Sequence, residues 1–333
     1  MTKDRVFCTP PVVQNAAGKV RSAGFELEYT GVSIFDSAQI VLQVFGGRHI
    51  AESTFVQRVE TDLGRFTCEI DTTFLKDRLY EKPLAALGIE LDPSNKEKLE
   101  SVLLGVVATI VPTEIAAPPM PITDLSPLDE LTRRLRDAGA KGTRASVLYI
   151  FGMHINAEIP SDHPGVLRDF LRAFILLYPW LKDRAEVDLS RSISPYIKPF
   201  PPEYARLILQ PDYPASHERL LDDYLRYNAS RNRPLDMLPV LAHLDRDRVM
   251  RQVEDAHLVK PRPAFHYRLP NCMVDEPDWS LSAEWNRWVA VERLAYDPDR
   301  IAEMSREYER AEEKSFRPFY EKWPDVLESY MRA

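Results

Sequence analysis

Two glutamates, Glu26 and Glu28, stand two residues apart within the otherwise apolar segment 24–31. Side chains of a strand alternate between its faces, so both carboxylates would share one face and the apolar residues between them the other. Two like charges this close repel each other, and burying them without a partner is costly. A divalent metal ion, often bound together with nucleotide phosphates, would stabilise them. The same segment also suits a solvated strand face, so the choice depends on the rest of the chain.

Acidic residues recur on other predicted strands. Glu69 and Asp71 repeat the two-residue spacing, and Glu114 is a single acid in an otherwise apolar strand. If these strands belonged to one sheet, their carboxylates would gather on one face and would need cations there. Taken singly, Glu69 and Asp71 would form an edge-strand pair, and Glu114 would be the partner of a buried arginine.

His154 lies in a further segment of alternating polarity. His154, Asn156 and Glu158 occupy one predicted strand face, and the residues between them are apolar. A single strand histidine is more often a structural residue than a ligand, whereas three successive polar positions on one face favour a site. The sequence leaves both interpretations open.

Cationic residues that could bind phosphate or carboxylate groups come late in the chain. Arg231 and Arg233 lie between two predicted helices, Arg262 and Arg268 flank the last predicted strand, and Lys198 lies in a proline-rich loop. The planar guanidinium group suits bidentate recognition of such anions. In a chain with 43 lysines and arginines, any one of these residues could equally form a surface ion pair.

Composition limits the class of protein. Of the 333 residues, 44% are hydrophobic and 28% are charged, which is typical of a soluble globular protein. The net charge of −8 argues against general binding to nucleic acid or to an anionic membrane. The three cysteines are far apart and form no C-x-x-C pair, and neither a signal peptide nor a bilayer-spanning segment is visible. We therefore expect a reduced, cytoplasmic protein.

The elements that must position these residues mix strands and helices without a regular alternation. The predicted strands are 25–34, 50–59, 65–72, 109–116, 146–158 and 264–269. The predicted helices are 37–45, 95–104, 124–138, 164–180, 203–209, 216–228, 234–244, 246–253, 281–295 and 298–331, the last of them charged and solvent-facing. Neither the glycine-rich dinucleotide motif nor the P-loop occurs. We predict an α+β fold with a mainly antiparallel sheet of about six strands and helices on one face.

The order of these motifs resembles the amidoligase family, a branch of the carboxylate–amine ligases that share the glutamine synthetase and glutamate–cysteine ligase fold. The similar segments are Gly24-Phe25-Glu26-Leu27-Glu28 (G-x-E-x-E), Asp71-Thr72-Thr73 (D-x-S), Glu114 to Met120 (E-I/L-V-S/T-P-P), Gly152-Met153-His154-Ile155-Asn156 (G-x-H-V-H), Arg231 to Pro239, and Phe265-His266-Tyr267-Arg268-Leu269 (E-F/Y-R). Each is short, so the resemblance lies in their order. Two residues depart from the pattern: Asn156 replaces the second histidine, and His266 replaces the late glutamate.

The resemblance implies one catalytic domain over residues 1–333, with a motif-bearing core at 24–269 and C-terminal helices at 281–333. It also implies an ATP- and Mg²⁺-dependent ligase, in which a carboxylate takes the γ-phosphoryl group and an amine then displaces phosphate to form an amide. The implied metal ligands are Glu26, Glu28, Glu114 and His266. The implied catalytic residues are Glu28, Asp71 and Arg268. The implied nucleotide contacts are His154, Arg231, Arg233 and Lys198.

Two other functions remain open at this point. A metal-dependent hydrolase would use the same acids and His154 without ATP or an amine. A catalytically decayed binding protein would explain the departures at Asn156 and His266. The expected partners are a small-molecule or peptide carboxylate and an amine, with no nucleic acid and no membrane, and the sequence leaves open whether the chain forms a homo-oligomer.

Overall fold

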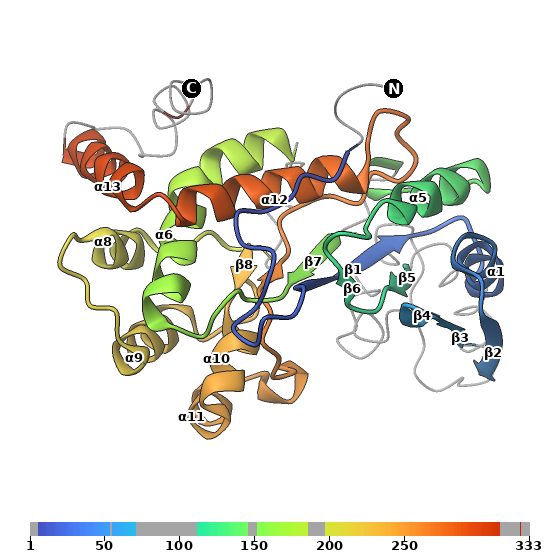
Figure 1. The fold of residues 1–333 in the computed structure, drawn as a ribbon, viewed down its shortest axis with the longest axis horizontal. Coiled ribbons are helices and arrows are strands. Elements are labelled where there is room, and N and C mark those ends of the chain that lie inside the picture. The colour runs from blue at the N-terminus through green and yellow to red at the C-terminus, as the bar shows by residue number, and fades with distance from the viewer. Residues whose placement is uncertain are drawn as a thin grey trace, which may run out of the picture.

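A nine-stranded sheet forms the centre of the computed structural model, which describes residues 6–53, 55–70, 112–145, 152–185, 197–313 and 327 (Figure 1). The strand order is β2-β3-β4-β5-β1-β7-β9-β8, and β6 pairs with β1 outside this path. Each pairing between these strands is antiparallel. The strands are β1 (Ser22–Tyr29), β2 (Arg48–Ser53), β3 (Val56–Thr61), β4 (Gly64–Ile70), β5 (Thr113–Ala116), β6 (Met120–Pro121), β7 (Met153–Ala157), β8 (Leu235–Asp236) and β9 (His266–Tyr267). The mainly antiparallel sheet is confirmed, but it is larger than the six strands predicted.

The additional strands come from segments predicted otherwise. The segment 50–59 forms the hairpin β2–β3 in place of a single strand. Leu235 and Asp236, predicted to begin a helix, pair with β9. Met120 and Pro121 were predicted to lie in a loop, but they pair with the start of β1. Proline has no N–H to donate to a ladder, and this ladder of two residues tolerates it.

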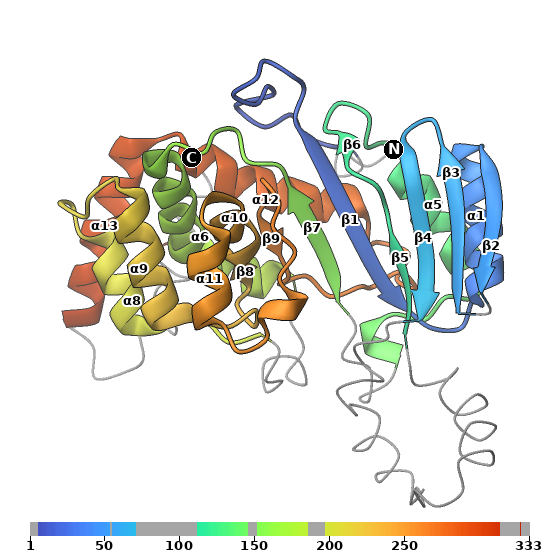
Figure 2. The ribbon, with the colours of Figure 1, turned by 90° about the horizontal axis from the view of Figure 1, so that it is seen from below.

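Helices cover one face of this sheet, as predicted. The helices of the described residues are α1 (Ile34–Phe45), α5 (Pro127–Asp137), α6 (Pro164–Arg184), α8 (Pro202–Leu209), α9 (His217–Asn228), α10 (Leu238–Leu244), α11 (Arg246–Gln252), α12 (Leu281–Ala295) and α13 (Pro298–Glu313). Seen from the open side of the sheet, α1, α5 and α12 lie behind the strands (Figure 2). The apolar face of β1 is buried here, and the ring of Phe25 packs 6.2 Å from that of Trp285 in α12.

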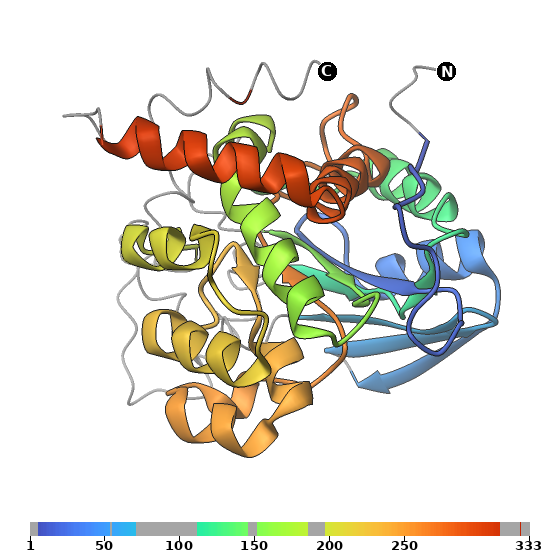
Figure 3. The same ribbon diagram turned by 60° about the vertical axis from the view of Figure 1, so that its left-hand side comes forward.

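The remaining helices gather at the β8 end of the sheet. Helices α8 and α9 pack against α6, while α10 and α11 pack against each other (Figure 2). Helix α13 lies across α6 (Figure 3). It was predicted to face solvent, but Ile301, Met304 and Tyr308 form a buried stripe along it. The predicted helix 95–104 lies outside the described residues.

Within the described part of the chain, every helix is too short or too polar to cross a bilayer.

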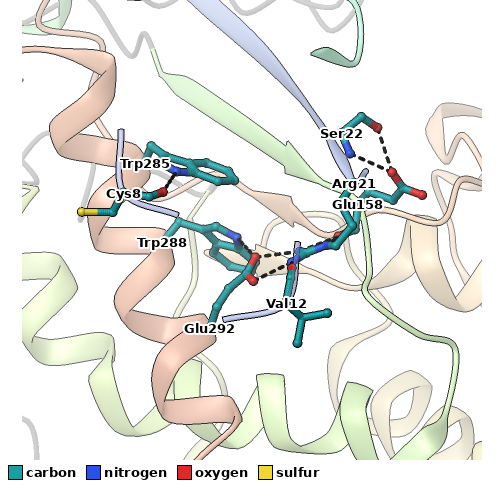
Figure 4. Close-up of polar contacts among 8 residues, drawn as sticks. All are labelled: Cys8, Val12, Arg21, Ser22, Glu158, Trp285, Trp288 and Glu292. Atoms are coloured by element: carbon teal, nitrogen blue, oxygen red, sulfur yellow. Dashed lines mark hydrogen bonds and ion pairs between the residues drawn. The ribbon is translucent and has the colours of Figure 1, made fainter. Parts of the chain in front are cut away.

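A buried ion pair fixes the start of β1 and the end of β7 to the helical layer (Figure 4). Arg21 and Glu292 of α12 form two hydrogen bonds, of 2.7 and 2.8 Å, and both side chains are fully buried. The guanidinium also donates to the carbonyls of Val12 and Glu158. The indole of Trp288 donates to Glu292 at 2.8 Å. Because its polar atoms are matched, this pair can be buried in the low-dielectric interior and define the position of both strands.

Candidate active site and metal centre

A row of three carboxylates crosses the middle of the open sheet face. Glu28 in β1 is directly opposite Glu114 in β5, and Glu114 is directly opposite Glu69 in β4. Cross-strand partners in an antiparallel ladder point to the same face, with Cβ atoms about 5 Å apart. The apolar residues of β1 face the helices, so the carboxylates point away from the core. Three acids in such a row favour the binding of cations.

Next to this row, Glu26 is tied to strand β7. Its Oε2 accepts a hydrogen bond from Nδ1 of His154 at 2.7 Å, and its Oε1 accepts one from Nδ2 of Asn156 at 2.8 Å. Both contacts follow from the register, which places His154 opposite Glu26. The other ring nitrogen of His154, Nε2, lies 3.8 Å from Oε1 of Glu28. One imidazole therefore links the two glutamates of β1.

The pKa of Glu26 reports this environment. Burial alone would raise the pKa, but the hydrogen bond with His154 and the electrostatic interactions with His266, His154 and Arg262 outweigh it. As a result, the pKa of Glu26 lies well below its usual value. The carboxylate is thus held in its anionic form, which is the form that binds a metal ion.

His266 in β9 completes the group from the other side of β7. Its Nδ1 lies 2.7 Å from Oδ1 of Asn156, which also accepts from Arg262 at 2.6 Å. The same Nδ1 also lies 3.2 Å from Nη2 of Arg262, so this ring nitrogen has both an acceptor and a donor beside it. Burial lowers the pKa of His266 well below its usual range; the charge of Glu26 opposes this shift, while His154, Arg268 and Arg262 add to it, so the imidazole is neutral.

Glu26, His154 and His266 converge closely enough to share an ion. Each of the three offers one ligand atom, and these atoms lie within 4.8 Å of one another. The two imidazole rings meet edge to face, with centroids 5.0 Å apart. A carboxylate and two imidazoles are all suitable metal ligands.

A cationic group lies at the β8–β9 end of the same face. Arg268 donates to the carbonyl of Arg231 at 2.9 Å, and both guanidinium groups interact electrostatically with buried Asp236. Burial raises the pKa of Asp236 to about 6, although Arg268 and Arg231 oppose this shift. Asp236 is opposite His266 in the ladder, so this cationic group borders the Glu26 cluster.

The structure brings together most of the predicted site residues on one sheet face. Glu26, Glu28, Glu114, His154 and His266 lie on β1, β5, β7 and β9, and Arg231 and Arg268 lie beside them.

Two predicted nucleotide contacts are placed differently. Arg233 donates to the carbonyls of Pro199 and Lys198, at 2.6 and 3.3 Å, and to that of Tyr227, at 3.0 Å. These bonds fasten the segment 197–200 to α9. The Lys198 side chain is exposed, while its backbone N–H donates to the carbonyl of Asn232 at 2.8 Å. Asp71 lies outside the described residues.

Two further residues belong to the site by position: Arg262, predicted only as one of several cations able to bind phosphate or carboxylate, and Asp236, which had no predicted role. Arg262 reaches Asn156 and His266, and its sequence signal was its position before the last predicted strand. Asp236 follows the Arg231–Arg233 segment and was hidden in a predicted helix. Their positions depend on the pairing of β8, β9 and β7, which links segments far apart in the chain.

Comparison with known proteins agrees with this arrangement. One family model matches residues 19–290, and its description is "Putative amidoligase enzyme". The match includes all of the site strands, from β1 to β9. No curated protein and no solved structure matches the chain. Because the family match covers well over half of the 333 residues, the chain belongs to the amidoligase family, whose name denotes enzymes that form amide bonds.

Proposed function

We propose that this protein is an ATP-dependent carboxylate–amine ligase that works through an acyl phosphate. A substrate carboxylate oxygen would attack the γ-phosphorus of ATP, the bond to the bridging oxygen would break, and ADP would leave. The amine nitrogen would then attack the acyl carbon, lose a proton and expel inorganic phosphate, leaving an amide. Phosphoryl transfer of this kind depends mainly on positioning and charge neutralisation.

The row Glu28–Glu114–Glu69 is the observation that carries the proposal. Its all-oxygen donor set suits Mg²⁺, which prefers carboxylate ligands and phosphate oxygens. A Mg²⁺ ion held there would neutralise phosphoryl oxygens. Glu28 and Glu114 are the ligands that we assign first, because each lies in the centre of the sheet and is positioned by pairing on both sides.

The cationic residues beside the row have a complementary role in the proposal. Arg268 and Arg231 would bind phosphoryl or carboxylate oxygens of the substrates, and the bond between the Arg268 guanidinium and the Arg231 carbonyl fixes their separation. His154, held by Glu26, would touch the metal or the nucleotide phosphate. Asp71 stays a candidate for binding the metal or the amine, on the family resemblance.

The test is release of ADP by the full chain with Mg-ATP and a panel of carboxylates and amines. We expect release to rise only when both substrates are present, with the amide detected by mass spectrometry. Glu28→Gln should lower the rate by roughly 100-fold or more, because it removes charge where phosphoryl transfer needs it. Glu130→Gln is the matched control, since Glu130 lies on α5 and pairs with Arg133 and Arg134 on the surface.

Three results would contradict the proposal. Product formation without ATP or an amine would indicate a hydrolase. Calorimetric binding of Mg-ATP without turnover across the panel would indicate a decayed binding protein. Full activity of Glu28→Gln would remove the carboxylate row from the site.

A further inference from the structure

Both carboxylate oxygens of Glu26 are already bonded within the protein. Oε2 accepts a hydrogen bond from Nδ1 of His154 at 2.7 Å, and Oε1 accepts one from Nδ2 of Asn156 at 2.8 Å. His154 is directly opposite Glu26, and Asn156 follows two residues later on the same face of β7, so the strand register produces both contacts. A metal ion at this carboxylate would have to compete with both donors for the oxygens.

The second ring nitrogen of His154 is directed away from Glu26. Nδ1 is held by the carboxylate, while Nε2 lies 3.8 Å from Oε1 of Glu28. A carboxylate bonded to one nitrogen of an imidazole fixes the tautomer and the orientation of the ring, and so aims the other nitrogen. Glu26 therefore aims His154 at the carboxylate row that begins with Glu28. An ion bound through Nε2 would lie on the far side of the ring from Glu26.

A side-chain cation lies next to Asn156. Oδ1 of Asn156 accepts a hydrogen bond from Nη2 of Arg262 at 2.6 Å, while Nδ2 donates to Glu26. One amide thus connects the guanidinium of Arg262 to the carboxylate of Glu26, and the two charges also attract each other electrostatically. The charge of Glu26 is therefore compensated by groups of the chain itself.

The two residues that depart from the family pattern are the ones that Arg262 contacts. Asn156 stands in place of a histidine and His266 in place of a glutamate, and Nη2 of Arg262 lies 2.6 and 3.2 Å from their side chains. Distances alone would admit an ion, since Glu26, His154 and His266 offer atoms within 4.8 Å of one another. However, the guanidinium repels a divalent cation, and histidine in place of glutamate removes a charge that would attract one. The group is therefore unsuited to a metal ion.

We propose that Glu26 is a positioning residue that aims His154, and that Arg262, through Asn156, supplies the positive charge that a metal ion would otherwise supply to Glu26. This role differs from the metal-ligand role that the family resemblance implies for Glu26 and His266. The inference rests on the proposed function only in taking the carboxylate row as the place where divalent ions bind. It predicts that the number of bound ions does not depend on Glu26.

The first experiment counts the Mn²⁺ ions bound to the full chain after removal of metals and without nucleotide. Mn²⁺ accepts the same oxygen ligands as Mg²⁺, and EPR measures its free concentration in titrations to saturation. Glu26→Gln should bind as many equivalents as the wild type, whereas Glu114→Gln should bind one fewer. The combined variant Asn156→His, His266→Glu and Arg262→Met should bind one more, because it removes the guanidinium and adds a carboxylate. Misfolding cannot produce such a gain.

The second experiment reads the tautomer of His154 by ¹⁵N NMR at alkaline pH. We expect the proton on Nδ1 in the wild type, because an ionised carboxylate can only accept a hydrogen bond. Glu26→Ala should lose this preference, and Glu26→Gln, which keeps an accepting oxygen, should restore it. A merely structural role of Glu26 would not give this dependence. Arg310→Met is the control for both experiments, because Arg310 is exposed on α13, and its ion count and tautomer should equal those of the wild type.

The proposal is overturned if Glu26→Gln loses one Mn²⁺ equivalent, if the combined variant gains none, or if Glu26→Ala leaves the His154 tautomer unchanged. Its outcome is separable from that of the ligase proposal, because neither measurement needs ATP or an amine. The expected ion counts and tautomers in a chain without ligase activity would support the inference and refute the ligase. Ligase activity in a chain whose Glu26→Gln variant loses an equivalent would do the reverse.

Discussion

Glu26 and His154 face each other across β1 and β7, with Oε2 and Nδ1 2.7 Å apart. The pair lies next to the row of carboxylates and keeps Glu26 ionised where burial would otherwise favour its neutral form. A residue on a neighbouring strand thus sets the protonation state of a candidate metal ligand, and the relation can be tested directly.

Replacing His154 by alanine should raise the pKa of Glu26. The hydrogen bond is lost, while burial continues to oppose the charged form. In the wild type, the lowered pKa of Glu26 adds stability that is fully present at pH above the pKa of the unfolded state. This stability is lost as the pH falls through the pKa of the folded state. The variant should therefore lose less stability on acidification. Carboxyl ¹³C titration of labelled glutamate measures the shift directly, and an unchanged Glu26 titration in His154→Ala would refute it.

Asp236 should make folding stability fall as pH rises. Burial raises its pKa to about 6 in the folded chain, above its unfolded value, so its contribution is complete at acidic pH and is lost as pH passes 6. Asparagine resembles the neutral acid, so the free energy of unfolding of Asp236→Asn should not fall in this way. Between pH 4 and pH 7, it should gain on the order of 3 kcal/mol relative to that of the wild type. Urea unfolding across this range measures the difference. A difference that does not vary with pH would show that Asp236 is not perturbed.

Breaking the buried pair Arg21–Glu292 should destabilise the protein strongly. Arg21→Met leaves a fully buried carboxylate without its cation, and we expect a loss of about 3–5 kcal/mol in the free energy of unfolding. The double variant with Glu292→Met should cost less than the sum of the single changes, because no lone charge stays buried. Arg310→Met is the control: Arg310 is exposed and its partner Glu307 is partly exposed, so the loss should be within about 1 kcal/mol. Equal losses in Arg21→Met and the control would contradict the assignment.

Strand alternation predicts which residues share a face, but not which strands are neighbours. The i, i+2 spacing of Glu26 and Glu28 is enough to place both on one side of β1. That Glu114 and Glu69 lie in line with Glu28 depends on register between strands distant in sequence, which local pattern does not specify. The same is true of Arg262, whose contact with Asn156 spans 106 residues.

The errors in the predicted elements have local causes. The hairpin β2–β3 turns near Ser53 without the glycine, proline or asparagine that usually signals a turn, so the pattern predicts one long strand. The first helix was predicted to begin at residue 37, but α1 begins at Ile34, because Ser33 caps it by accepting from the Asp36 N–H at 3.1 Å. Helix α13 was predicted to face solvent because most of its residues are charged. Ile301, Met304 and Tyr308, which stand among those charged residues in the sequence, are buried.

The bond between Arg21 and Glu292 joins residues separated by 271 positions. On the ribosome, the N-terminal partner emerges long before α12 does, by roughly 15–50 s at ordinary elongation rates. Throughout that interval the guanidinium lacks the anion that compensates its burial. The first strand of the nascent chain can therefore reach its final position only after α12 has been made, so completion of this sheet waits for a segment far downstream.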